Sequence, residues 1–213
     1  MSKIEVDAIE PQSGTTLTIG ASGDSVTLGS GASLTSPGLT LSDNILFNAA
    51  SKGIYLGVTS ATASNLLDDY EEGTWTPIYT VSTGTDYPSI TYDAFTGGKY
   101  TKIGRLVSIQ ATLRTDAVDS TGVTGAIQIG GLPFAAAGNT TASQRDGICA
   151  VSLTDQSDWS SGNTPNTGVL GGTIITIGQL YSSSSNTSSI LGTNLQTGAN
   201  KNRINIQAVY MTA

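Results

Sequence analysis

The residues best suited to act on a ligand lie in a polar loop near position 155. Asp155 and Asp158 are three residues apart, and Trp159 follows directly. Two carboxylates about 5–9.5 Å apart are sufficient for glycoside hydrolysis, and the indole beside them offers a face on which a sugar ring could stack. A polar loop of Ser, Gly and Asn is equally typical of a plain connection. Of the three interpretations we favour a plain structural loop, then saccharide or receptor contact without catalysis, and last catalysis.

A second candidate recognition element is the loop that begins at Tyr181. Seven Ser or Thr residues and one Asn fill positions 182–189. In antibody loops, tyrosine supplies a rigid contact and small hydroxyl residues supply adaptable hydrogen bonds. The alternative, which we favour, is a mobile hairpin tip. If the protein has a surface recognition site, the residues we expect in it are Asp158, Trp159 and Tyr181.

Other reactive groups are scarce. The chain has no histidine, which excludes Ser–His–Asp and Cys–His nucleophiles and histidine-based zinc sites. The single cysteine, Cys149, lies between apolar neighbours and is interpreted as a small buried hydrophobe. Four acids cluster at Asp68, Asp69, Glu71 and Glu72; without EF-hand spacing, a solvated joint is favoured over a calcium site. We therefore predict no catalytic residue, no metal and no cofactor.

The composition limits both the fold and the partners. Only 16 acidic and 9 basic residues occur among 213, for a net charge of −7. Such a chain lacks the cationic surface that a nucleic-acid partner requires. It also contains no apolar stretch of about 18 residues that could insert in a membrane, and its first residues lack the apolar core of a signal peptide. The abundance of Thr, Ser and Gly, with few charges, favours strands and tight turns, hence an all-β fold.

Residues 15–60 consist of very short strand-like units. In each unit two apolar residues are separated by one position, as in the pairs Leu17/Ile19, Val26/Leu28, Ile45/Phe47 and Ile54/Leu56. A unit of this size cannot bury its own apolar pair, so stacking on other copies of the chain is required. We favour a repetitive, oligomeric β-shaft here over a disordered leader.

Two further segments flank this shaft. Residues 1–14 are interpreted as a separate attachment segment whose apolar contacts are Ile4, Val6 and Ile9. Residues 61–72 are expected to form a short helical or irregular joint, because Ser64 or Asn65 could cap one helical turn.

Residues 73–213 are predicted to form one β-sandwich. Within 106–114, Val107, Ile109, Ala111 and Leu113 alternate with polar residues, which indicates a half-buried strand. The last strand, 203–211, places Ile204, Ile206, Ala208 and Tyr210 on one face. The other expected strands span 75–81, 98–103, 126–129, 145–153, 169–180 and 190–195. Strands of this kind without intervening helices favour an antiparallel sandwich of jelly-roll type.

Several of these segments also resemble a known family. The stretches 9–20 and 22–29 resemble the shafts of fibre-like structural proteins of tailed bacteriophages, with those of marine cyanobacterial phages most similar. The stretch 66–77 resembles the junction at which such shafts meet a C-terminal domain, and 98–107 and 131–134 are similar to the opening strands of that domain. The resemblance implies a homotrimer attached to the virion by its N-terminus, with the C-terminal domains outward.

Because the chain lacks a long shaft or an inserted β-helix, we expect a non-enzymatic virion structural protein, namely a homotrimeric short tail fibre or knob that could contact the host surface. The alternatives are a capsid decoration or head fibre protein and a glycan-degrading tailspike enzyme. The expected partners are copies of the chain, other virion proteins and a host surface glycan or receptor. The expected location is the virion, assembled in the host cytoplasm without a signal peptide.

Overall fold

The structure, a computed structural model, divides the chain into two compact units, residues 1–46 and 47–213. It describes residues 9, 11, 13–15, 19, 25–30, 33, 38, 40–41, 44–137, 147–152, 158–160, 162–180 and 187–212. Of the predicted attachment residues, Ile9 is exposed, whereas Ile4 and Val6 lie outside the described residues. Among the described residues no helix has the length and apolar character needed to cross a membrane.

The second unit begins with a small ribbon. Strand β1 (Ile54–Tyr55) pairs antiparallel with β2 (Leu66–Leu67), and the short 3-10 turn η1 (Ala63–Asn65) precedes β2. Leu56 follows β1 and donates its backbone N–H to the Asn65 carbonyl. Leu66 is half-buried, whereas the other apolar side chains of this ribbon are exposed, as are those of Ile45 and Phe47 before it.

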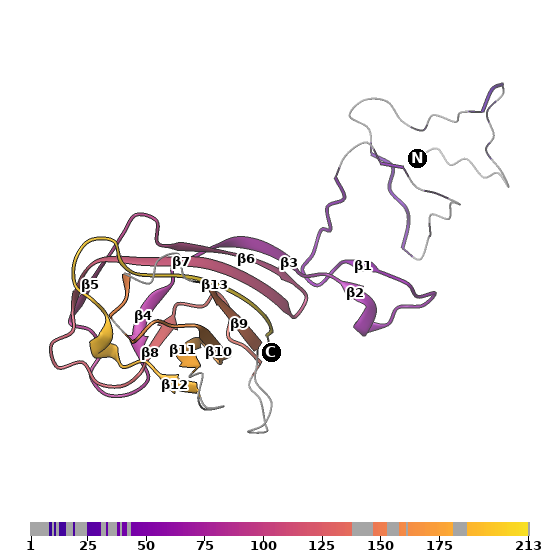
Figure 1. Ribbon diagram of the computed structural model, residues 1–213. Coiled ribbons are helices and arrows are strands. Elements are labelled where there is room, and N and C mark those ends of the chain that lie inside the picture. The colour runs from indigo at the N-terminus through magenta and orange to yellow at the C-terminus, as the bar shows by residue number, and fades with distance from the viewer. Residues whose placement is uncertain are drawn as a thin grey trace. The chain divides into compact units, whose positions relative to one another are not determined.

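The rest of this unit is an antiparallel β-sandwich, which confirms the predicted all-β class (Figure 1). Nine of its eleven strands are hydrogen-bonded in the order β3-β6-β7-β13-β9-β10-β11-β8-β4. The other two pair beside this path, β5 with β7 and β12 with β11. The strands are β3 (Tyr70–Trp75), β4 (Ile78–Val81), β5 (Ser89–Tyr92), β6 (Gly97–Ile103), β7 (Leu106–Asp119), β8 (Ile127–Gly130), β9 (Gly147–Ser152), β10 (Thr167–Gly171), β11 (Ile174–Leu180), β12 (Thr187–Ser189) and β13 (Lys201–Met211).

The two longest strands, β7 and β13, lie side by side and carry much of the core. Their register sets Ile204 opposite Leu113, Ile206 opposite Ala111, Ala208 opposite Ile109 and Tyr210 opposite Val107. All eight of these side chains are buried. Both predicted inward faces are therefore confirmed, and they point to the same side of the sheet.

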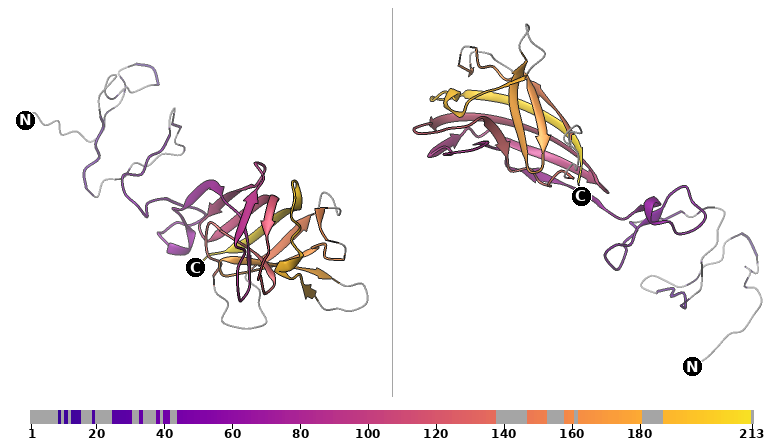
Figure 2. Two further views of the ribbon diagram at one scale, coloured as in Figure 1. Left: turned by 90° about the vertical axis from the view of Figure 1, so that its left-hand side faces the viewer. Right: turned by 90° about the horizontal axis from the view of Figure 1, so that it is seen from below.

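The sheet bends so that its two halves enclose this core. In Figures 1 and 2, β3, β6, β7 and β13 form one layer, and β10, β11, β8 and β4 face them. The facing layer contributes Ile127, Ile129, Ile175 and Ile177, which are all fully buried. Apolar faces from both layers thus meet in one core, as in a sandwich.

The two ends of the sheet path are neighbours in sequence. β3 and β4 are separated only by Thr76 and Pro77, so the chain crosses directly from one edge of the sheet to the other. The Tyr79 backbone N–H of β4 donates to the Tyr92 hydroxyl of β5, at 2.6 Å. This contact links the edge strand β4 to β5, which pairs with β7 in the other layer.

Several predicted boundaries were wrong, for local reasons. The single strand expected over 75–81 is divided between β3 and β4 because Pro77 has no N–H for the ladder. The strand expected over 169–180 is the hairpin β10–β11, which turns at Gly172 with φ 58°. The range 190–195 is not a strand but contains the 3-10 turn η3 (Gly192–Asn194). Strand β5 was not foreseen.

The predicted joint over 61–72 is also shorter than expected. Only Ala63–Asn65 is helical, and β3 starts at Tyr70, inside the range assigned to the joint. The backbone N–H of Gly104 donates to the Asp69 carbonyl at 2.7 Å. The sandwich therefore begins about three residues before Gly73.

Candidate functional site

The predicted surface residue Trp159 belongs to the core instead. Its side chain is 3% exposed, and its indole Nε1 donates to the Arg203 carbonyl at 2.8 Å. The ring packs edge-on against Tyr79, with centroids 6.3 Å apart. Trp159 cannot offer a face to a ligand, so its assignment to a recognition surface was wrong. The polar residues around it gave no sign that this side chain turns inward.

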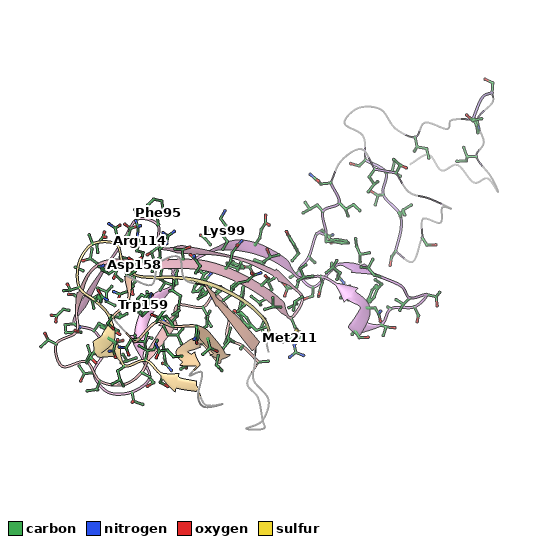
Figure 3. All side chains as sticks on the ribbon, viewed as in Figure 1. Phe95, Lys99, Arg114, Asp158, Trp159 and Met211 are labelled. Carbon is green, nitrogen blue, oxygen red and sulfur yellow. The ribbon has the colours of Figure 1, made fainter. Side chains whose placement is uncertain are left out.

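The other loop candidates are not brought together by the structure. Asp158 is half-buried beside Trp159 (Figure 3), whereas Asp155 and Tyr181 lie outside the described residues. Within the described part of the chain, no cluster of three or more His, Cys, Asp or Glu side chains could hold a metal ion.

The acidic side chains at the start of the sandwich have side-chain partners on β3 and β6. Asp69 forms an ion pair with Lys102, whose side chain is 11% exposed. Glu71 accepts a hydrogen bond from the Tyr100 hydroxyl at 2.5 Å. Glu72 accepts one from the Tyr70 hydroxyl at 3.0 Å. The first two contacts attach the start of β3 to β6, and the third lies within β3. Glu71 and Glu72 remain exposed, and the Asp69 side chain is 46% exposed, so these acids are solvated as expected and also hydrogen-bonded locally.

A concave surface lies on the outer face of the first layer. Here β3, β6, β7 and β13 present the side chains that alternate with the buried ones. A groove of about 930 Å³ crosses these strands, lined by residues 74–76, 94–99, 110–112 and 205–207. A second hollow of about 510 Å³ shares Thr74, Lys99, Gln110 and Gln207 with it. The two hollows therefore adjoin along this row of side chains, and we call them together the outer groove.

Strand register explains the floor of the outer groove. Thr74 pairs with Lys99, Lys99 with Gln110, and Gln110 with Gln207, which forms one row across four strands. The next row joins Gly97, Thr112 and Asn205. A Cβ placed on Gly97 would meet no atom within 4 Å, so the missing side chain leaves open space in this row.

An exposed aromatic residue stands at one end of the groove. Phe95 is 73% exposed, and the Arg114 guanidinium lies 4.8 Å from its ring centroid (Figure 3). A cation over an aromatic face is attracted by the ring quadrupole. Arg114 is itself held by an ion pair with Asp93, at 2.7 Å.

The loop under Phe95 is closely hydrogen-bonded. Asp93 Oδ1 accepts the Phe95 backbone N–H at 2.7 Å, and the Asp93 carbonyl accepts that of Thr96 at 2.9 Å. The Thr96 hydroxyl donates to the Arg114 carbonyl and accepts from the Arg114 N–H. Phe95 is therefore an exposed aromatic ring on a fixed support, which is the property of a preorganised binding residue.

The charged side chains near the groove differ in whether they have an ion-pair partner. The hydrogen bond from Arg114, the backbone N–H of Phe95 and the nearby charge of Arg203 lower the pKa of Asp93, so this carboxylate stays ionised and paired. Lys99 is exposed and has no ion-pair partner among the described residues. Its ammonium group is thus available to an incoming anion.

Sequence reasoning missed the outer groove. The polar residues Gln110 and Thr112 were interpreted only as the solvent side of a strand. Their significance depends on neighbours from β3, β6 and β13, and a single sequence does not show which strands are adjacent. One part of the groove could have been predicted from the sequence. An Asp side chain commonly accepts the backbone N–H two residues further on, which predicts an Asx-turn from Asp93 to Phe95.

Comparison with known proteins gives little guidance. No family model and no curated protein matches the chain. Among solved structures, the crystal structure of Dettilon tailspike protein is similar over 67% of this chain and 24% of that one, with 17% identity and a TM-score of 0.49. The chain thus spans about a quarter of the length of that protein.

Proposed function

We propose that the protein is a non-enzymatic structural component of a bacteriophage virion, associated with the tail. In this proposal it is a homotrimeric short fibre or knob, with the jelly-roll-like sandwich as its outer domain. The observation that carries the proposal is the exposure of apolar pairs in the segment that precedes the sandwich. The phage assignment itself rests on the sequence resemblance of the shaft and junction segments.

The exposed pairs are large side chains at alternate positions. Ile45 and Phe47 are 56% and 41% exposed, and Ile54 and Leu56 are 45% and 54% exposed. Fully burying one such side chain is worth about 1.5–3 kcal/mol. Several copies of the chain that stack along this segment would cover these pairs, whereas one chain leaves them in water. This supports association through the segment and fits a shaft.

The N-terminal segment and the sandwich would then have separate roles. Residues 1–14, including Ile4, Val6 and Ile9, would attach the shaft to other virion proteins. The sandwich, which carries the outer groove, would face outward and contact the host surface. A groove lined mainly by amides, hydroxyls and one ammonium group, with Glu72 as the one carboxylate among its lining residues, favours contact over catalysis, because glycoside hydrolysis uses two carboxylates.

The association is tested by sedimentation of the full chain. We expect a trimer for the unchanged protein and for Ser60→Asp, which adds a charge at an exposed polar position of the same segment. Ile54→Asp combined with Leu56→Asp should give monomers, because carboxylates would replace the apolar contacts. A monomeric unchanged protein would refute the proposal.

Its place in the particle needs a separate measurement. Antibody against the sandwich, labelled with gold and applied to intact phage, should mark the tail. Label over the capsid would instead favour the decoration or head fibre protein.

A further inference from the structure

We propose that the outer groove binds a saccharide chain that carries carboxylate groups, with Phe95 as the stacking residue and Lys99 as the residue that selects for negative charge. The inference deepens the proposed host contact and rests on it for the biological source of the ligand. The groove itself is an independent feature of the sandwich.

The groove has the hydrogen-bonding groups that a sugar chain requires. Gln110 and Gln207 lie directly opposite each other on β7 and β13, and each amide offers two donors and one acceptor oxygen. The row of four strands from Thr74 to Gln207 is about 14 Å wide, because neighbouring strands lie about 4.8 Å apart. Such a row can contact several sugar hydroxyls along a chain.

The position of Phe95 adds an apolar contact. Its ring is exposed at the groove and packs against the Arg114 guanidinium, which is held in place by its ion pair with Asp93. A rigid aromatic ring loses little conformational entropy when a ligand packs on it. Sugar rings have an apolar C–H face that suits this contact, while their hydroxyls remain directed to the amides.

The charge of the preferred sugar follows from Lys99. This ammonium lies in the row between Thr74 and Gln110, and Asp93 at the far end of the groove is paired with Arg114. Glu72, which lines the second hollow, accepts a hydrogen bond from the Tyr70 hydroxyl and keeps its own charge. An accessible cation is notable in a chain of net charge −7. A carboxylate on the ligand would form a charge-assisted hydrogen bond with it, stronger than a neutral one.

The same features favour a saccharide over an acidic peptide. The groove lies on the face of the sheet, where backbone groups are already paired between strands, so a peptide could not add itself as a strand there. Its floor is formed by amide, hydroxyl and glycine positions. These match a ligand dense in hydroxyl groups.

The test is calorimetry on the full-length protein with two acidic probes, tetragalacturonate and a hyaluronan tetrasaccharide. The neutral counterpart of tetragalacturonate is its methyl ester, and that of the hyaluronan tetrasaccharide is fully N-acetylated chitotetraose. We expect the acidic probes to bind at least about tenfold more tightly, in line with one charged hydrogen bond. Added salt should reduce this preference, because salt screens exposed charges.

Three variants locate the binding. Lys99→Gln should abolish the preference for acidic probes and leave the weak neutral binding unchanged, whereas Lys52→Gln, an exposed lysine outside the sandwich, should change nothing. Phe95→Ala should weaken all probes. Gly97→Thr should fill the groove and remove binding while the melting temperature is kept or raised, because a Cβ there meets no atom within 4 Å and threonine suits a strand better than glycine.

The opposing outcomes are equally definite. No binding of either acidic probe at millimolar concentration, equal binding of acidic and neutral probes, unchanged binding after Gly97→Thr, or tighter binding of a tetraglutamate peptide would each overturn the inference. A monomer that binds the acidic probes would refute the fibre and retain the groove. A trimer that binds none of them would do the reverse.

Discussion

The two regions of the second unit use the same sequence pattern with opposite results. In β7, Ile109 and Ala111 are separated by one residue and are 2% and 7% exposed. In the preceding ribbon, Ile54 and Leu56 have the same spacing and are 45% and 54% exposed. The difference lies in what covers these side chains. Strand β7 has paired strands on both sides and a facing layer, whereas β1 and β2 pair only with each other. A period-two pattern therefore indicates an apolar strand face that is stabilised by burial. It does not indicate whether the same chain or another copy packs against that face.

The largest expected effect comes from a charge placed in the covered region. Ile109→Asp buries a carboxylate among Val107, Ala208 and the facing layer, which costs several kcal/mol even after relaxation. This is comparable with the roughly 5–15 kcal/mol that stabilises a domain. Chemical denaturation of the full chain, followed by tryptophan fluorescence, should show the sandwich largely unfolded or close to it.

Gln110→Asp is the matched control, since Gln110 is exposed on the other face of the same strand. We expect it to lower the free energy of unfolding by well under half as much. Equal destabilisation of both variants, at an unchanged oligomeric state, would contradict the assigned register of β7.

The covered region should also depend on its buried polar groups. Asn202 is fully buried; its Nδ2 donates to Thr115 Oγ1 and to the Gln196 carbonyl, both at 2.7 Å, and its Oδ1 accepts the Gln196 N–H at 2.8 Å. Asn202→Ala leaves these groups unpaired and should cost about 2–3 kcal/mol. Asn48→Ala in the uncovered segment, where the residue is exposed, should be within about 0.5 kcal/mol of neutral. Similar losses in urea unfolding would mean that Asn202 contributes little.

A charge in the uncovered region should separate assembly from folding. Ile54→Asp should change the free energy of unfolding of the sandwich by less than about 0.5 kcal/mol, as is usual for exposed positions, while it weakens association of copies. Circular dichroism melts and sedimentation on the same sample give the two readouts. A large loss of sandwich stability in a variant that remains assembled would show that the ribbon is part of the sandwich core.

The last prediction concerns alkaline pH. Burial raises the pKa of Tyr92 and of Tyr210 to about 12 each, above the value of about 10 for an unfolded chain. Because the unfolded state then loses protons first, stability is fully present below pH 10 and falls as pH rises toward 12. Ultraviolet absorbance of phenolate should thus rise together with loss of the circular dichroism signal. Ionisation of these tyrosines near pH 10 in an intact fold would contradict their burial.

Sequence reasoning predicted the core better than the site. The alternation of apolar and polar residues from Val107 to Leu113 and from Ile204 to Tyr210 was sufficient to assign the buried face of each strand. A strand that is buried on one side has apolar residues at every second position. The position of Trp159 was not predictable in this way, since a single indole in a polar loop carries no periodicity. The outer groove required the adjacency of β6 and β13 to β7, and β13 is nearly 90 residues distant along the chain. The jelly-roll connectivity stays a prediction.

The central place of β13 has a consequence for synthesis on the ribosome. This strand lies between β7 and β9 and pairs with both, so the two halves of the sheet have no common strand until residues 201–211 have left the exit tunnel. Strands β3 to β12 are synthesised before β13. Until β13 is available, the strands that pair with it have unpaired backbone groups at one edge, and such edges are prone to pairing with other chains. Nascent chains stalled before residue 200 should therefore remain sensitive to protease, and a chaperone that shields open strand edges should raise the yield of folded protein.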